Sequence, residues 1–146
     1  MTQEELIQKI KTIGDRATSI EHPLESRVYI SCEAENGYEI SRFLFEDVGA
    51  RFVIATAIDC EDYFEIIYHF SYDQTGCVIN QKTFIRDHEN PQIESIAPLI
   101  PGAEWIEREM HDLYGIHFKN HPRLERLILA DDWPEGVYPL RKEKKS

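Results

Sequence analysis

The sequence predicts an α+β fold, in which helices pack on one face of a mostly antiparallel sheet and are followed by a short helix and an extended C-terminal tail. Apolar residues recur at every second position over residues 64–72, as in a half-buried strand, and a D-Q-T-G turn separates this run from a second strand-like run over 77–85. Apolar residues recur at helical spacing over 3–13 and again after Asn36. Strands joined by so short a turn run antiparallel, which sets the class of the sheet.

The N-terminal part of the chain predicts a helix, a strand and a second helix. Residues 3–13 form an amphipathic pattern that Gly14 ends. Residues 27–32 alternate as in a strand. From Asn36 onward the apolar residues return to helical spacing, until Gly49 supplies the stop. We therefore expect these two helices to cover one face of the sheet.

The middle of the chain predicts a three-stranded meander over residues 52–58, 64–72 and 77–85. Residues 59–62 are polar and form the turn between the first two strands. After Asp87, prolines interrupt a segment that is too irregular for a long element.

Residues 103–114 predict a short helix that Gly115 ends. Its apolar residues lie at positions i, i+4, i+7 and i+8 and should form the buried stripe: Ile106, Met110, Leu113 and Tyr114. Beyond Gly115, about 30 residues show little periodicity, which in a compact domain usually indicates disorder or function. We therefore divide the chain into an α+β domain, residues 1–118, and an extended partner-docking tail, residues 119–146.

The net charge of −11 disfavours nucleic acid and anionic lipid as direct partners, because both repel an acidic surface. From Phe118 onward, seven basic residues face five acidic ones, a balance of +2, so the first 117 residues carry −13. The basic end is either a solvated tail or a segment that docks on a complementary surface.

No apolar run approaches the roughly 18 residues of a membrane-spanning helix, and the polar N-terminus is not expected to be a signal peptide. Cys32, Cys60 and Cys77 lack the short spacings that iron–sulfur clusters and structural zinc require, and three free cysteines suit a reducing compartment. If the protein works at a membrane, we expect it to lie on a partner without inserting into the lipid.

An ordered set of motifs marks the last third of the chain. The predicted helix carries E-R-E-M-H-D from Glu107, and it is followed by H-P at 121–122, D-D-W at 131–133 and P-L-R-K at 139–142. This set resembles the C-type subunit of NADH–quinone oxidoreductase, which is the thirty-kilodalton-type subunit of complex I. The same family includes a small subunit of energy-converting, membrane-bound nickel–iron hydrogenases. The sequence departs from the family pattern at Glu125, where a basic residue is expected, and its shortness favours the hydrogenase branch.

The resemblance implies a non-catalytic structural or assembly subunit of a membrane-bound, complex I-like oxidoreductase. It would belong to the cytoplasmic arm of an energy-converting nickel–iron hydrogenase and dock on the large catalytic subunit. The first alternative is the C-type subunit of NADH–quinone oxidoreductase, and an alternative of another class is a free-standing protein-binding module. The location implied is peripheral, on the cytoplasmic face of the cell membrane.

The partner interface is expected to comprise the charged helix and the tail motifs: Glu107, Arg108, Glu109, Asp112, His121, Pro122, Trp133, Tyr138, Pro139, Leu140, Arg141 and Lys142. The i, i+4 pairs within the helix are worth only about 0.2–0.5 kcal/mol each, too little to explain so many charges by self-stabilisation. Arg108 could instead pair with a carboxylate of another subunit. We therefore expect Arg108→Glu to weaken assembly more than folding.

A metal site and a carboxylate-based enzyme are the remaining interpretations of the chain. The candidate metal ligands are His111, Asp112, His117 and His121, but no H-E-x-x-H pattern occurs among them. Neither G-x-S-x-G, G-x-G-x-x-G nor a P-loop is present, and no nucleophile accompanies the acidic pairs. We expect no catalytic, cofactor or metal site in this chain. The resemblance implies iron–sulfur clusters, and in a hydrogenase a nickel–iron centre, in two partners: the large hydrogenase-like subunit and the cluster-bearing small subunit.

Overall fold

The computed structural model describes residues 1–125, 134 and 136–142. Its elements follow the chain in this order: α1 (Gln3–Lys11), a 3-10 turn (Gly14–Arg16), β1 (Ser19–Leu24), β2 (Arg27–Glu33), α2 (Ala34–Arg42) continued by a π-helical turn (Phe43–Asp47), β3 (Arg51–Asp59), β4 (Phe64–Tyr72), β5 (Cys77–Ile85), β6 (Gln92–Glu94), a 3-10 turn (Pro101–Ala103), α3 (Glu104–Tyr114) and β7 (His117–Lys119).

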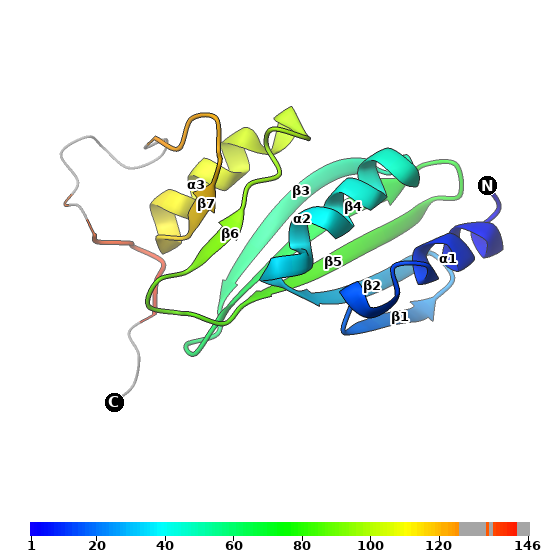
Figure 1. Cartoon of the computed structure of the whole chain (residues 1–146), viewed down its shortest axis with the longest axis horizontal. Helices are drawn as coiled ribbons and strands as arrows, with labels where there is room; N and C mark the ends of the chain where they lie inside the picture. The colour runs from blue at the N-terminus through cyan, green and yellow to red at the C-terminus, as the bar shows by residue number, and fades with distance from the viewer. Residues whose placement is uncertain (126–133, 135, 143–146) are drawn as a thin grey trace.

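Five strands form one sheet in the order β1-β2-β5-β4-β3, and β6 pairs with β7 in a separate two-stranded sheet (Figure 1). Within the large sheet only the β2–β5 pair is parallel, and the other three pairs are antiparallel. Figure 1 shows α1 and α2 on the same side of this sheet, while α3 lies beside β6 and β7 at one end. The predicted fold class is confirmed.

The core lies between the large sheet and the helices. The side chains of β4 alternate between buried and half-buried along its whole length, as the sequence pattern requires. α2 approaches β5 closely because position 37 is glycine: a Cβ there would lie 3.1 Å from the Thr83 methyl group. Gln81 is fully buried below α2, where its amide accepts from the Ser41 hydroxyl at 2.9 Å and donates to the Gly37 carbonyl at 2.9 Å.

The structure also contains elements that the sequence pattern did not predict. β1 is an edge strand with almost no buried residue, so it lacks the alternation that reveals β2 and β4. β6 and β7 are only three residues long, which is too short for any periodicity. β7 ends at Lys119, so the predicted boundary between residues 118 and 119 falls inside this strand. Over the described ranges, no helix is long and apolar enough to cross a membrane.

Candidate partner interface

Helix α3 presents a charged side to the interior of its own chain. It begins after the Pro101–Ala103 turn and ends at Gly115, whose φ of 77° is left-handed and suits glycine. Glu107, Arg108 and Asp112 are buried along with Met110. Trp105, in contrast, is 62% exposed.

Glu107 is fully buried and its carboxylate accepts two hydrogen bonds from one loop. The Ser95 hydroxyl donates to Oε1 at 2.7 Å, and the Ile96 backbone N–H donates to Oε2 at 3.2 Å. Burial raises the pKa of Glu107 to about 7, although these hydrogen bonds act in the opposite direction. Glu107 therefore fastens α3 to the loop that follows β6.

The His121-Pro122 turn is held against the start of α3. His121 Nε2 lies 3.0 Å from the Glu104 carbonyl, and Nδ1 accepts from the Arg123 backbone N–H at 2.9 Å. These partners assign the proton of the neutral ring to Nε2. Nε2 is also 3.9 Å from Glu107 Oε1, which is too long for a hydrogen bond.

Arg108 joins α3 to the segment beyond β7. It is 6% exposed, and its Nε donates to the Glu125 carbonyl at 3.1 Å. Its guanidinium carbon lies 5.4 Å from the centre of the Trp105 ring, a cation–π distance. The contact uses the backbone of Glu125, so it does not depend on the side chain that departs from the family pattern.

The structure therefore differs from the expected orientation of this helix. Glu107, Arg108 and Asp112 contact their own chain and are at most 6% exposed, so they do not present their charges to a partner here. Glu109 is half-buried, and Pro122 is exposed. The role of these last two at a partner surface stays a prediction.

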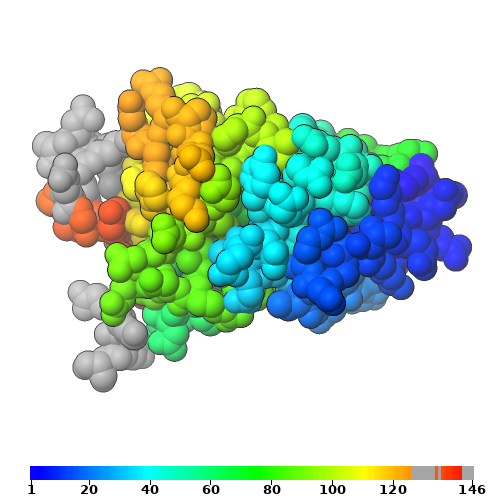
Figure 2. Space-filling model, in the orientation of Figure 1, coloured from blue at the N-terminus to red at the C-terminus, as the bar shows by residue number. Residues whose placement is uncertain are grey.

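Residues 138–142, which we call the C-terminal latch, lie against the domain from which the tail departs. Figure 2 shows the red end of the described chain beside the yellow surface of α3. The Leu140 N–H donates to the Leu113 carbonyl at 3.0 Å, and the Tyr138 ring covers Gly115 so closely that a Cβ there would lie 2.4 Å from it. The Lys142 N–H donates to Asp59 Oδ2 at 2.6 Å.

Asp59 is the main hydrogen-bond acceptor that the domain offers to the latch. Its Oδ1 lies 2.8 Å from His88 Nε2 and also accepts from the Glu61 N–H at 2.9 Å. Burial by itself raises the pKa of Asp59, but the N–H groups of Lys142 and Glu61 and the His88 ring outweigh it, so that the pKa is lowered.

The Phe64 ring makes two further contacts beside the latch. The Phe64 ring stacks on His88 with ring centres 4.5 Å apart, and Arg141 lies over the Phe64 ring at 5.6 Å. Arg141 also donates to the carbonyls of His88 and Glu89.

The tail was expected to dock on a partner, and the structure describes contacts between its end and its own domain. Tyr138, Arg141 and Lys142 contact their own domain, because Asp59 and Phe64 offer an acceptor and an aromatic face. Pro139 and Leu140 keep exposed side chains, so their contact with a partner stays a prediction. Trp133 and the D-D-W motif lie outside the described residues.

Replacing Asp59 by alanine is expected to release the latch, because Lys142 N–H and His88 lose their shared acceptor. The free energy of unfolding should fall by about 1–3 kcal/mol, and hydrogen exchange at the Leu140 and Lys142 amides should accelerate. Asp62→Ala is the matched control, since Asp62 is an exposed carboxylate in the same turn. Unchanged protection of both amides in the Asp59 variant would mean that apolar contacts alone hold the latch.

The candidate metal ligands do not converge on one point. His111 Nδ1 bonds to the Ile116 carbonyl at 2.9 Å, and His121 bonds to backbone groups through both ring nitrogens. Within the described ranges, no three His, Cys, Asp or Glu side chains are grouped as a metal site would need.

Sequence reasoning missed two features of this region. Trp105 falls outside the apolar stripe that was predicted for α3. Its position off that stripe could have predicted that the tryptophan side chain is exposed. The Asp59–His88 pair joins residues 29 positions apart, and no local signal announces it.

Known proteins share both the sequence and the fold of this chain. Residues 30–146 match the family described as respiratory-chain NADH dehydrogenase, 30 kDa subunit. The C-type subunit of F420H2 dehydrogenase from Methanosarcina mazei is 35% identical over 130 residues, which cover 85% of this chain and 78% of that protein. The C-type subunit of NADH-quinone oxidoreductase from Roseiflexus sp. is 38% identical over 111 residues, which cover 72% of this chain but only 62% of the relative.

A chain of the membrane-bound sulfane sulfur reductase, an archaeal respiratory membrane complex, has a similar structure. The TM-score is 0.79 at 27% sequence identity, and the alignment covers 94% of this chain and 82% of that chain. The structural similarity therefore extends over more of the chain than the family match over residues 30–146.

Proposed function

Because the chain belongs to the family of the respiratory-chain NADH dehydrogenase 30 kDa subunit, we propose that it is a non-catalytic structural subunit of a membrane-bound, complex I-like oxidoreductase. The relatives that are C-type subunits of dehydrogenases, and the similar chain in a respiratory membrane complex, support this proposal. We also propose that this chain binds a larger, hydrogenase-like subunit and a cluster-bearing small subunit and holds them in a defined arrangement. Iron–sulfur clusters, and a nickel–iron centre in the hydrogenase case, would belong to those partners.

The exposed Trp105 is the structural observation that supports docking through α3. Tryptophan is among the residues most enriched at the energetic centres of protein interfaces. Here the ring is 62% exposed, and Arg108, which is itself buried, lies over it. A ring that is held in place by a fixed cation loses little freedom when a partner covers it.

The identity of the parent enzyme is a finer proposal. Identities of 35% and 38% to C-type subunits favour a dehydrogenase that passes electrons to a membrane carrier. The second candidate is the energy-converting nickel–iron hydrogenase, which the motifs from Glu107 to Lys142 also resemble. The adjacent large subunit decides between them, because a hydrogenase must keep two C-x-x-C pairs as nickel ligands. In either case we propose a peripheral position on the cytoplasmic side of the membrane.

Purification of the native complex through a tag on this chain tests the proposed function. The expected result is co-purification of a hydrogenase-like large subunit together with iron, and nickel in addition if the parent is a hydrogenase. Recovery of the tagged chain alone from mildly solubilised membranes would contradict the proposal and support a free-standing module.

Within that complex, Trp105→Ala is expected to weaken docking by about 2 kcal/mol, which corresponds to a roughly 30-fold loss of affinity. The measurement is the amount of large subunit that the tagged variant retains through a dilution series. Leu24→Ala is the control, since Leu24 is 58% exposed but lies on β1 at the far edge of the sheet. Wild-type retention by the Trp105 variant would place the docking surface elsewhere.

A further inference from the structure

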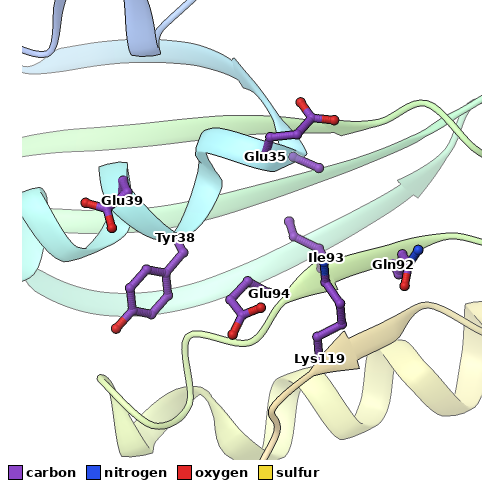
Figure 3. A pocket seen from close by; sticks show the side chains of 8 residues that line it. Glu35, Tyr38, Glu39, Gln92, Ile93, Glu94 and Lys119 are labelled. Carbon is purple, nitrogen blue, oxygen red and sulfur yellow. The ribbon is translucent and has the colours of Figure 1, made fainter.

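A groove of about 490 Å³ lies where α2 meets the two-stranded sheet. α2 forms one wall with Glu35, Tyr38 and Glu39, and β6 forms the other wall along its whole length. Lys119 of β7 closes one side (Figure 3). Figure 3 shows Tyr38 and Glu94 reaching into this space from opposite walls.

The edge of β6 that faces away from β7 has no neighbouring strand among the described residues. The Pro91 carbonyl and the Ser95 N–H both bond to β7, at 2.9 Å each, and Ile93 is paired between them. Backbone groups of a strand point alternately to its two sides, so those of Gln92 and Glu94 point away from β7. They have no hydrogen-bond partner in the part of the chain that the structure describes. An unpaired edge of this kind accepts an extended segment as an added strand.

The side chains around the groove define the chemistry of that segment. Glu35, Glu39 and Glu94 surround it, and Lys119 is the single cation in its described lining. Glu94 accepts from the Asn120 amide and Glu39 pairs with Arg42 at 3.4 Å, whereas no ion pair involves Glu35 in the described part of the chain. Tyr38 supplies apolar surface, whereas Ile93 is only 2% exposed and packs toward α2. The groove therefore favours a strand with lysine or arginine side chains on the carboxylate side and an apolar residue between them.

We propose that this groove binds an extended basic segment of a partner subunit, which adds to β6 as a third strand. A second copy of this chain is a poor occupant, because its first 117 residues carry −13. The chain's own Arg141 and Lys142 are poor occupants as well, since both are held at the Asp59 end of the domain. The proposal rests on the proposed function only in taking the segment from another subunit, and it uses none of the residues of the α3 surface.

The test is a titration of the isotope-labelled full chain with a nine-residue capped peptide of alternating lysine and threonine, followed by nuclear magnetic resonance. The amide signals of Gln92 and Glu94 are expected to shift and to exchange more slowly with solvent. A peptide of alternating glutamate and threonine should leave them unchanged. N-methylation of the central amides of the lysine peptide keeps its charge but removes its donors, and should weaken binding about tenfold or more.

The double variant Glu35→Lys/Glu39→Lys should also weaken binding about tenfold. Its control, Glu21→Lys/Glu25→Lys, makes the same change of charge at exposed positions around β1 and should bind like the wild type. Equal affinity for the N-methylated peptide would overturn strand addition, and absence of shifts at Gln92 and Glu94 would overturn the site. Neither result would affect co-purification of the large subunit, so failure here is distinct from failure of the proposed function.

Discussion

Replacing Arg108 by glutamate is expected to lower the free energy of unfolding by about 3–5 kcal/mol, because the new carboxylate would be buried without a partner of opposite charge. Arg108 is only 6% exposed, and its Nε donates to the Glu125 carbonyl, which a carboxylate cannot replace as a donor. Glu107 and Asp112 are buried on the same helix, so the variant would add a third buried carboxyl group to it. A loss of this size is a large share of the stability of a small domain.

Thermal and urea denaturation of the purified chain measure this effect. Glu109→Arg is the matched control, since it reverses a charge on the neighbouring, half-buried position and should change stability by less than about 1 kcal/mol. If Arg108→Glu melted like the wild type yet failed to assemble, Arg108 would be the partner contact that the sequence pattern favoured. The structure thus reverses the expected order of the two effects: folding should suffer first, and loss of assembly should follow from it.

The bounds of α3 were predictable, whereas the burial of its charged residues was not. A stripe of apolar residues at helical spacing marks only the part of a helix that packs on other apolar surface. Glu107 is buried because Ser95 and Ile96 place a hydroxyl and an N–H against it, and both belong to an irregular stretch 12 and 11 residues upstream. Helical periodicity carries no information about a donor that a distant loop supplies.

The large sheet shows the same division between local and non-local information. β4 and β5 were predicted to the residue, because β4 alternates along its whole length and a short turn joins it to β5. β1 was missed: it is polar, it contains Pro23, and a proline is tolerated on such an edge strand. The parallel pairing of β2 with β5 joins Arg27 to Val78, a separation that no local pattern reports.

The residues of the tail motif make contacts that the sequence pattern did not predict. The P-L-R-K end was recognised from its residue types, and the structure places Arg141 and Lys142 on Asp59, Phe64 and His88 of the same chain. Two large apolar side chains of these elements stay exposed: Trp105 on α3 and Leu140 on the latch, 62% and 51% exposed. The charged groups therefore make intramolecular contacts, and the proposed docking would use the apolar side chains.

Glu107 provides the second large effect, a fall in stability as the pH rises. Its pKa in the folded chain is about 7, against 4.5 for an unperturbed glutamate, and burial is the main cause. Between these two values the folded chain keeps a proton that the unfolded chain has lost. Stability is linked to this difference in bound protons, so the contribution of Glu107 is complete below pH 4.5 and is lost as the pH rises to about 7. Each pH unit in this window removes about 1.4 kcal/mol, which sums to roughly 3 kcal/mol.

Glu107→Gln isolates this contribution, because an amide has the shape of the protonated carboxyl and does not titrate. Relative to the wild type, the variant should gain roughly 3 kcal/mol between pH 4 and pH 8, as measured by urea denaturation at each pH. A constant offset is also expected, since the amide NH₂ cannot accept the hydrogen bond that the Ser95 hydroxyl now donates. The readout is therefore the slope of the difference against pH. Glu109→Gln, on the same helix, should retain the wild-type slope.

A difference between Glu107→Gln and wild type that stayed flat from pH 4.5 to 7 would show that Glu107 is already ionised inside the fold at acidic pH. The two Ser95 and Ile96 hydrogen bonds would then outweigh burial, and the raised pKa would be wrong. The expected slope would show instead that ionisation of Glu107 near neutral pH destabilises the packing of α3 against the loop after β6. Arg108 and Trp105 belong to the same helix. A mildly acidic pH, at which Glu107 is protonated, should therefore stabilise the docking surface that we propose around Trp105.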